Sequence, residues 1–271
     1  MILKMDFVLR ILFFLLIGAV SGGLLTVAGK LFFVQTDETV EKITEALPGA
    51  NCGGCGFAGC EAYANAIAKG DAKPNMCSPG GLEVNKKISA ILGVAVEETE
   101  PVVAYVHCNG CNSATEDKYK YIGTKSCIAA EKFYHGKGSC SFGCIGFGDC
   151  VNACDSGGIE IKDGVAVINP AKCIACGKCI KACPNHLISF KKKSALAAVR
   201  CSSQDTGKIT RTVCKNGCIG CGVCVKKCPE GAIVVNGNHA EIDYNKCVSC
   251  GIFAGACPIK CIEMLEKCAD V

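Results

Sequence analysis

The chain has 271 residues, a formal net charge of +4, 26 cysteines and no tryptophan. So mild a charge, without a basic helix carrying interleaved aromatic residues, gives no reason to expect a nucleic-acid partner. The cysteine fraction fits either a disulfide scaffold or a protein that binds metal through thiolates. Disulfide scaffolds are usually short secreted chains, which this chain does not resemble in length.

The first predicted element is an apolar helix. Residues 8–28 are apolar except for Arg10 and Ser21, and about 20 such residues cross a bilayer. Gly18 and Gly22 have the spacing that lets membrane helices pack closely. We interpret residues 1–34 as a single-pass transmembrane anchor in contact with membrane lipid. A cleaved signal peptide is the alternative, but an exported chain would oxidise its thiols before clusters were inserted. We therefore expect the other domains on the cytoplasmic side of the inner membrane.

The next predicted domain, residues 35–100, is a small helical module. Helices are expected over 61–69, where Gly70 ends the helix, and over 82–92. Four thiolates are enough to bind one [4Fe–4S] cluster, and a structural zinc knot is the alternative. The candidate ligands are Cys52, Cys55, Cys60 and Cys77.

Two later segments match the cysteine run of bacterial ferredoxins, C-x2-C-x2-C-x3-C-P. Residues 173–184 read C-I-A-C-G-K-C-I-K-A-C-P, and residues 218–229 read C-I-G-C-G-V-C-V-K-K-C-P. Iron is a soft metal that prefers sulfur ligands, and Gly177 and Gly222 permit the sharp turn that such a loop needs. Zinc ribbons also pair C-x2-C motifs but do not usually carry the run ending in Cys-Pro, so the sequence predicts iron–sulfur clusters.

Residues 101–195 and 196–271 are predicted to be two copies of a two-cluster ferredoxin-like domain. The first copy begins with Val106-His107-Cys108 and the second with Val199-Arg200-Cys201. Each copy also has a β-rich segment around Asp-Gly or Asn-Gly, which predicts a hairpin. The expected fold class is therefore α+β, with an N-terminal transmembrane helix, a small helical 4Fe-4S module and two tandem ferredoxin-like domains.

The ligands of these domains follow from the rule that the fourth cysteine of a run binds the other cluster. In the first copy, Phe147 stands at the second ligand position of one run, and we expect Cys140 to substitute. The predicted sets are Cys154, Cys173, Cys176 and Cys179, then Cys140, Cys144, Cys150 and Cys183. In the second copy they are Cys218, Cys221, Cys224 and Cys257, then Cys228, Cys247 and Cys250.

The last of these sets has only three thiolates, because Phe253 occupies its third ligand position. Clustered free thiols oxidise easily, so we expect an unusual cluster here rather than an empty site. It would be a [3Fe–4S] cluster or a [4Fe–4S] cluster with a borrowed ligand, and Phe253→Cys would change the iron content little.

Seven further cysteines either complete an extra cluster or are buried as small apolar side chains. They are Cys108, Cys111, Cys127, Cys201, Cys214, Cys261 and Cys268. The whole chain is expected to hold at least four [4Fe–4S] clusters, and five or more if some of these cysteines take part.

The order of these parts resembles the B subunit of the Rnf complex, in the longer form of anaerobic bacteria. The most specific feature is L-P-G-A-N-C-G-G-C-G-F-A-G-C at residues 47–60, with C-S-P-G-G at residues 77–81. The resemblance implies an electron-relay subunit of a membrane complex that oxidises reduced ferredoxin, passes electrons towards NAD and couples this to Na+ or H+ translocation. It implies soluble ferredoxin as the donor, and places the flavins and the NAD site on other subunits.

Two other functions remain open at this point. One is a self-contained iron–sulfur reductase that acts on a small substrate, and the other is a zinc-binding membrane scaffold. The chain has no Ser/His/Asp arrangement, phosphate loop or dinucleotide fingerprint, and its four histidines have no metal-binding spacing. We therefore predict no catalytic residues and no complete catalytic site on this chain alone.

Overall fold

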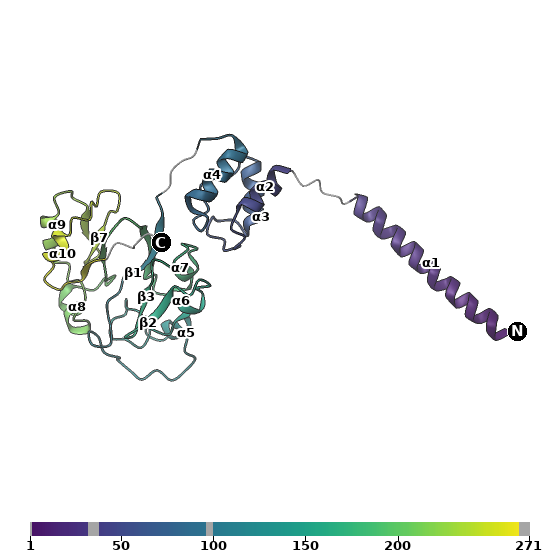
Figure 1. Cartoon of the computed structure of the whole chain (residues 1–271). Helices are drawn as coiled ribbons and strands as arrows, with labels where there is room; N and C mark the ends of the chain where they lie inside the picture. Colours follow the sequence, from purple (N-terminus) through teal and green to yellow (C-terminus); the bar gives the residue numbers. More distant parts are fainter. Residues whose placement is uncertain (1, 32–37, 96–99, 266–271) are drawn as a thin grey trace. The chain divides into compact units, whose positions relative to one another are not determined.

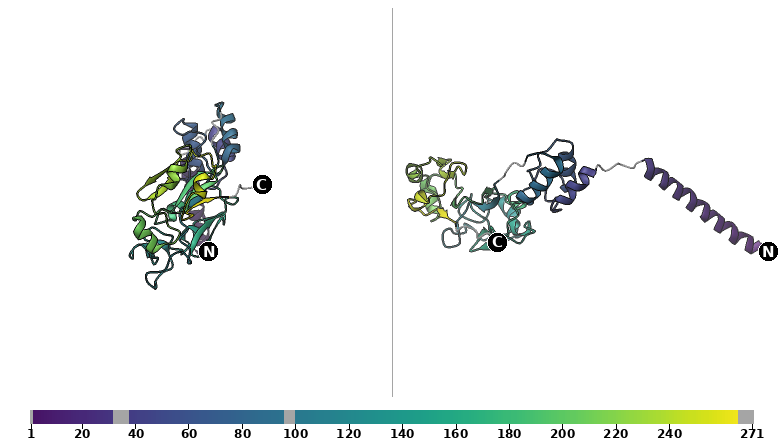
Figure 2. Two further views of the ribbon diagram at one scale, coloured as in Figure 1. Left: turned by 90° about the vertical axis from the view of Figure 1, so that its left-hand side faces the viewer. Right: turned by 45° about the horizontal axis from the view of Figure 1, so that its top comes forward.

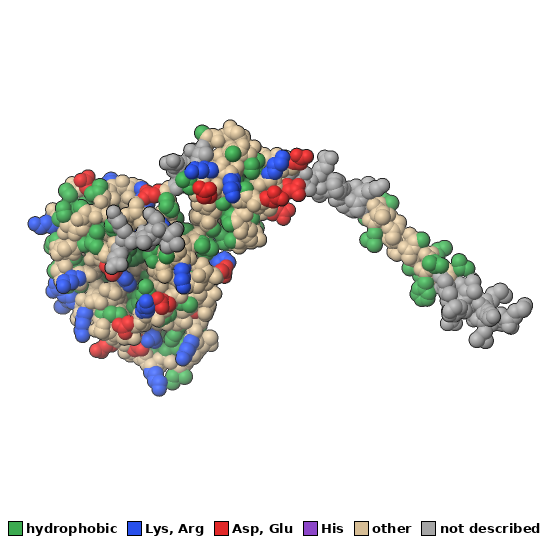
Figure 3. Space-filling model, viewed as in Figure 1, with side chains coloured by type: hydrophobic (Ala, Val, Ile, Leu, Met, Phe, Trp, Pro, Cys, Tyr) green, Lys and Arg blue, Asp and Glu red, His purple; other side chains and the backbone are tan. Residues whose placement is uncertain are grey.

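The computed structural model describes residues 2–31, 38–95 and 100–265, and it divides into two compact units, Met1–Glu41 and Lys42–Val271. The first unit contains helix α1 (Ile2–Leu31), whose side chains are described from Leu12 to Ala28. Large apolar side chains are exposed along this stretch, as Figure 3 shows in green.

The transmembrane helix expected at residues 8–28 is not supported by this structure. No helix within the described residues combines the length and the apolar character that crossing a membrane requires.

Three helices make up the module that precedes the ferredoxin-like repeats. They are α2 (Glu38–Ala46), α3 (Cys60–Ala68) and α4 (Gly81–Leu92), and Figures 1 and 2 show them grouped together. Ile43, Ile67 and Ile88 are buried on their facing sides. The helices predicted over 61–69 and 82–92 are confirmed, and Gly70 follows α3 with a positive φ of 80°.

The first ferredoxin-like repeat is built from an outer strand pair and an inner hairpin. Strand β1 (Val102–Val106) pairs antiparallel with β4 (Ile188–Lys192), so that the start of the repeat meets its end. Strands β2 (Ile159–Lys162) and β3 (Val165–Ile168) form the predicted hairpin. Its turn residues, Asp163 and Gly164, both have positive φ, as a tight hairpin turn requires. Short helices α6 (Asp149–Asn152) and α7 (Lys178–Ala182) follow the cysteine loops.

The second repeat has the same plan. Strand β5 (Ala197–Val199) pairs with β8 (Ile262–Met264), and β6 (Ile233–Asn236) pairs with β7 (His239–Ile242) in the predicted hairpin. Helices α9 (Val223–Lys227) and α10 (Ile252–Gly255) correspond to α6 and α7 of the first repeat, respectively, in following a cysteine loop. The internal duplication expected from the sequence is therefore visible strand by strand.

The repeats differ in the segment that joins the first strand to the first cysteine run. In the first repeat it is the long segment 109–139, which contains α5 (Cys127–Glu131). In the second repeat the shorter segment 202–213 contains α8 (Gly207–Val213). This difference in length decides where the extra cysteines of the first repeat lie.

Cysteines form a large part of the core in both repeats. In the first they are buried with Ile159, Val165 and Leu187, and in the second with Ile233 and Phe253. Each hairpin adds only a few aliphatic side chains, so the interior depends on what the thiols bind as well as on apolar packing.

Candidate iron–sulfur sites

Four pockets in the unit Lys42–Val271 are lined by cysteine side chains. The thiols are distributed around these pockets instead of converging on one point. Within the described part of the chain, no three histidine, cysteine, aspartate or glutamate side chains are placed to hold a single metal ion. A four-iron cluster is a larger group, with one thiolate on each iron, and a ring of cysteines around a pocket suits it.

The first pocket brings together four cysteines that the crossing rule assigns to one cluster. Ala175 and Gly177, within the cysteine loop, both have positive φ, and this curls the loop around its thiols. Burial, together with the neighbouring thiols, raises the pKa of Cys179 to about 11. The lining cysteines are Cys154, Cys173, Cys176 and Cys179.

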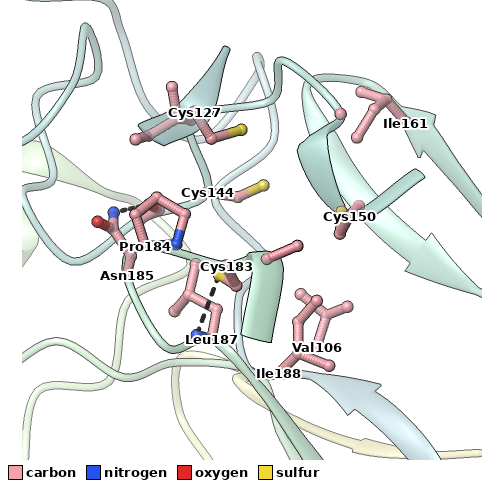
Figure 4. Close-up of a pocket in the computed structure, with 15 residues that line it drawn as sticks. Val106, Cys127, Cys144, Cys150, Ile161, Cys183, Pro184, Asn185, Leu187 and Ile188 are labelled. Carbon is pink, nitrogen blue, oxygen red and sulfur yellow. Dashed lines mark hydrogen bonds between the residues drawn. The ribbon is translucent and has the colours of Figure 1, made fainter. Parts of the chain in front are cut away.

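The second pocket, drawn in Figure 4, is lined by Cys127, Cys144, Cys150 and Cys183. Apolar side chains from β1, β2, β3 and β4 complete its wall. The main-chain N–H of Leu187 donates to the sulfur of Cys183 at 3.4 Å. Burial raises the pKa of Cys150 to about 12, and the other thiols add to the effect. The pocket offers four sulfur ligands, an N–H donor to sulfur and protection from water.

Cys127, and not Cys140, lies with the other three cysteines of this pocket. Asp149 fixes it there by accepting hydrogen bonds from the Ser126 hydroxyl at 2.8 Å and the Ile128 N–H at 3.0 Å. Ser126 also caps α5 by accepting from the N–H of Ala129. Burial alone would raise the pKa of Asp149, but these hydrogen bonds outweigh it and lower the pKa below its ordinary value.

Sequence spacing provides no direct sign of Cys127, because it comes from the long segment 109–139 and not from a cysteine run. The available signal is indirect: Ser126 is a good N-cap residue, and it starts a short helix immediately before this cysteine. Phe147, at the vacant ligand position, packs against the ring of Tyr121 at 5.4 Å between ring centroids.

The third pocket belongs to the second repeat. Cys261 also lines it, with its sulfur 3.6 Å from that of Cys257. Hydrogen bonding with Cys261 lowers the pKa values of Cys218 and Cys257. Cys221 is exposed, so one edge of this site faces solvent. The four cysteines that the crossing rule groups here are Cys218, Cys221, Cys224 and Cys257.

The last cysteine run has a different environment. Phe253 is 1% exposed and packs in the core with Cys228 and Cys247, while Cys250 is exposed. These three cysteines line none of the four pockets. The loop still has left-handed residues, Ser249 and Gly251, at the positions where the other runs have them. The backbone of a cluster loop is retained, and the phenyl ring occupies its interior.

The helical module gathers its cysteines around the start of α3. Asn51 accepts a hydrogen bond from the N–H of Cys60 at 2.8 Å. The buried hydroxyl of Tyr63 donates to the carbonyl of Lys73 and accepts from the N–H of Met76, which fixes the chain just before Cys77. Burial raises the pKa of Cys77, and nearby negative charge on Cys60, Cys55 and Cys52 acts in the same direction. The four predicted ligands therefore lie close together.

The fourth pocket contains cysteines that no predicted set joined: Cys108, Cys201 and Cys214 line it together with Cys140. Cys111 lies nearby, 3.2 Å from the hydroxyl of Ser113, but does not line this pocket. Cys268 lies outside the described residues.

Comparison with known proteins agrees with these sites. Residues 47–79 match the family model described as a putative Fe-S cluster, and residues 166–189 and 215–234 match a 4Fe-4S binding domain. The B subunit of the ion-translocating oxidoreductase complex of Methanosarcina acetivorans is 43% identical over 92% of this chain and 94% of its own. The chain belongs to the family of B subunits of ion-translocating oxidoreductase complexes. The family resemblance based on residues 47–81 is therefore confirmed.

Other members of this family of B subunits are also similar along most of their length. The B subunit of the proton-translocating ferredoxin:NAD(+) oxidoreductase complex of Clostridium ljungdahlii is 39% identical over 84% of this chain and 81% of its own. The B subunit of the Na(+)-translocating ferredoxin:NAD(+) oxidoreductase complex of Acetobacterium woodii is 38% identical over 93% of this chain and 72% of its own.

Proposed function

We propose that the chain relays electrons within an ion-translocating ferredoxin:NAD+ oxidoreductase complex, taking them from reduced ferredoxin and passing them towards NAD. The observation that carries this proposal is the series of cysteine-lined pockets in a chain of this family. The names of two relatives supply the reaction and its coupling to H+ or Na+. As the sequence resemblance implies, NAD and flavin sites belong to other subunits of the complex.

We assign four [4Fe–4S] clusters to the thiol sets described above. Bound clusters supply one-electron transfer, with potentials set by hydrogen bonds to sulfur and by exposure. The chain supplies thiolate ligands, apolar walls that exclude water and N–H donors to sulfur such as that of Leu187. The proposed sets are Cys52, Cys55, Cys60 and Cys77; Cys154, Cys173, Cys176 and Cys179; Cys127, Cys144, Cys150 and Cys183; and Cys218, Cys221, Cys224 and Cys257.

The last run, in this proposal, holds no cluster. From the sequence alone we expect an unusual cluster there, because clustered free thiols oxidise easily. The buried ring of Phe253 argues for a different interpretation, because it takes the interior position where a ligand would point. Packing against the core also shields part of Cys228 and Cys247 from solvent without a metal.

The helical module is the proposed neighbour of the first repeat in the relay. Gly54 lies in its cysteine loop, and a Cβ at this position would be 3.1 Å from the carbonyl oxygen of Cys176. A Cβ at that distance would be a tight contact, so the glycine favours close approach of the two cysteine loops. Close approach of two clusters is what transfer of electrons between them requires.

Two surfaces fit the partners of such a subunit. Lys226 and Lys227 lie in the last turn of α9, close in sequence to the exposed Cys221, and basic side chains there suit an acidic soluble ferredoxin. The exposed apolar side chains of α1 suit contact with lipid or with membrane subunits of the complex. We accordingly place the chain at the cytoplasmic membrane, with its cluster domains on the cytoplasmic side.

The proposal is tested with Cys176→Ala in the assembled complex, in membranes prepared without oxygen. We expect ferredoxin-dependent NAD reduction to fall at least tenfold, while iron in the other sites is retained. Cys111→Ala is the matched control, because Cys111 belongs to none of the four proposed sets, and it should keep full activity. Full activity in Cys176→Ala membranes that have lost the corresponding iron would show that electrons do not pass through this chain.

A further inference from the structure

The pocket between the two ferredoxin-like repeats is lined by four cysteines that none of the proposed clusters uses. Cys108, Cys201 and Cys214 are buried and Cys140 is partly buried. With the open space at its mouth included, this pocket measures about 470 Å³, against about 340 Å³ by the same measure for the pocket around Cys154 and Cys173. It therefore has the ligands and the space that the other sites have.

The four cysteines form two matched pairs, one from each repeat. Cys108 directly follows the first strand of its repeat after Val106-His107, and Cys201 follows its own first strand after Val199-Arg200. Each of the other two stands four residues before the first cysteine of a run: Cys140 before Cys144, and Cys214 before Cys218. Each repeat thus contributes the same two positions to one shared pocket.

The hydrogen bonds to these sulfurs repeat in the same way. The sulfur of Cys108 accepts from the N–H of Gly110 at 3.4 Å and from the N–H of Cys144 at 3.4 Å. The sulfur of Cys201 accepts from the N–H of Ser203 at 3.5 Å, and Ser203 is the residue equivalent to Gly110.

The other pair, Cys140 and Cys214, lines the same pocket from matching positions in the two repeats. N–H donors directed at sulfur stabilise thiolate charge, which a metal-bound cysteine carries and a neutral thiol does not.

Polar contacts hold the two repeats together at the rim of this pocket. A ring nitrogen of His107, Nδ1, lies 3.1 Å from the carbonyl oxygen of Val199. In the other direction, Arg200 donates to the carbonyl of Cys108 at 3.1 Å and the Ser202 hydroxyl donates to the carbonyl of His107 at 3.2 Å. The thiols from the two repeats are therefore held in a fixed relation to each other.

We propose that Cys108, Cys140, Cys201 and Cys214 bind a further [4Fe–4S] cluster shared by the two repeats. Cys144 lines both this pocket and the one in Figure 4, and Cys214 stands four residues before Cys218, a proposed ligand of the third site. The shared cluster therefore lies between the clusters of the two repeats and connects them. It extends the proposed relay, but its presence is measured without any assay of electron transfer.

The test compares single variants from opposite repeats in the full chain, purified without oxygen. Cys108→Ser and Cys214→Ser should each lose about four iron atoms per chain and the same EPR signal of the dithionite-reduced protein. Because both remove one shared site, the double variant should lose no more iron than either single variant. Cys111→Ser, close to the pocket but outside it, is the control and should keep all of its iron. Unchanged iron in Cys108→Ser and Cys214→Ser, or additive losses in the double variant, would overturn the proposal.

A variant that loses more iron than one cluster holds has unfolded. In that case the iron content of the unmodified chain decides whether the shared cluster exists. Five clusters give about 20 iron atoms per chain and four give about 16, with acid-labile sulfide in the same amount. The higher value, together with EPR of five interacting centres, supports the shared cluster. The lower value overturns it.

Discussion

In two of the cysteine runs, one in each repeat, a phenylalanine stands at a ligand position. The two phenylalanine rings lie in different environments. In the first repeat Phe147 packs against Tyr121 and leaves the pocket to Cys127 from α5. In the second repeat Phe253 lies inside the core. The first run keeps a full ring of four thiols, and the second does not.

The position of the lost ligand within the run explains this difference. The third position points inward in every run: Cys150, Cys179 and Cys224 are 8%, 7% and 7% exposed, and Phe253 is 1% exposed. The second position lies nearer the surface, where Cys221 and Cys250 are exposed. A ring at the second position can turn outward and leave space for another thiol, whereas a ring at the third position fills the site.

Cys127→Ala should have the largest effect, because it removes the ligand that replaces the missing cysteine of the first run. We expect the loss of about four iron atoms per chain and of one EPR signal, with the signals of the other clusters retained. Anaerobic iron analysis with EPR measures this. If the iron content stays unchanged, the ring of thiols in Figure 4 is not a cluster site.

Phe253→Cys should restore a cluster in the last run, with a gain of about four iron atoms per chain. Its loop already has the left-handed Ser249 and Gly251 that the other cluster loops share. Phe147→Cys is the matched control, and it should add no iron because Cys127 already completes that set. An unchanged iron content in Phe253→Cys would favour the sequence-based expectation that three thiolates there already bind an unusual cluster.

Asp149→Asn should have a smaller effect, on how firmly Cys127 is held. Removing a charged acceptor from the Ser126 hydroxyl and the Ile128 N–H costs about 1–3 kcal/mol. We expect faster loss of iron from this site to a chelator, with a normal iron content at the start. Asp155→Asn, which changes only the exposed ion pair with Lys178, should lose iron at the unmodified rate.

The stabilisation that Asp149 provides also depends on pH. Because its folded pKa is lowered, the stabilisation is present above the ordinary aspartate pKa and is lost as pH falls through the lower, folded value. At neutral pH, therefore, Asp149 is ionised and its hydrogen bonds to the start of α5 stabilise the fold fully. If the chelation rates of the unmodified chain and Asp149→Asn are equal at neutral pH, this role of Asp149 is excluded.

Local sequence patterns predicted much of this molecule but missed contacts between residues that are far apart in the sequence. The cysteine spacing predicted which thiols meet around Cys173 and Cys218, and Asp163-Gly164 predicted the hairpin of the first repeat. Cys127 could not be placed, because a hydrogen bond to Asp149 in another segment decides its position. Nor could Cys140 be separated from Cys144, since only the packing of one repeat against the other gives it different partners.

The shared pocket also bears on how the protein is made. A chain folds from its N-terminus during synthesis, so Cys108 and Cys140 are in place while Cys201 and Cys214 are still to be translated. A first repeat alone has half of a binding site, and its equivalent in another nascent chain has the same half. If the proposed cluster forms, two such halves together supply four thiolates, so pairing between chains is the assembly error that we expect for this fold. Closure by the second repeat, through contacts such as that of Arg200 with the carbonyl of Cys108, completes the pocket within one chain.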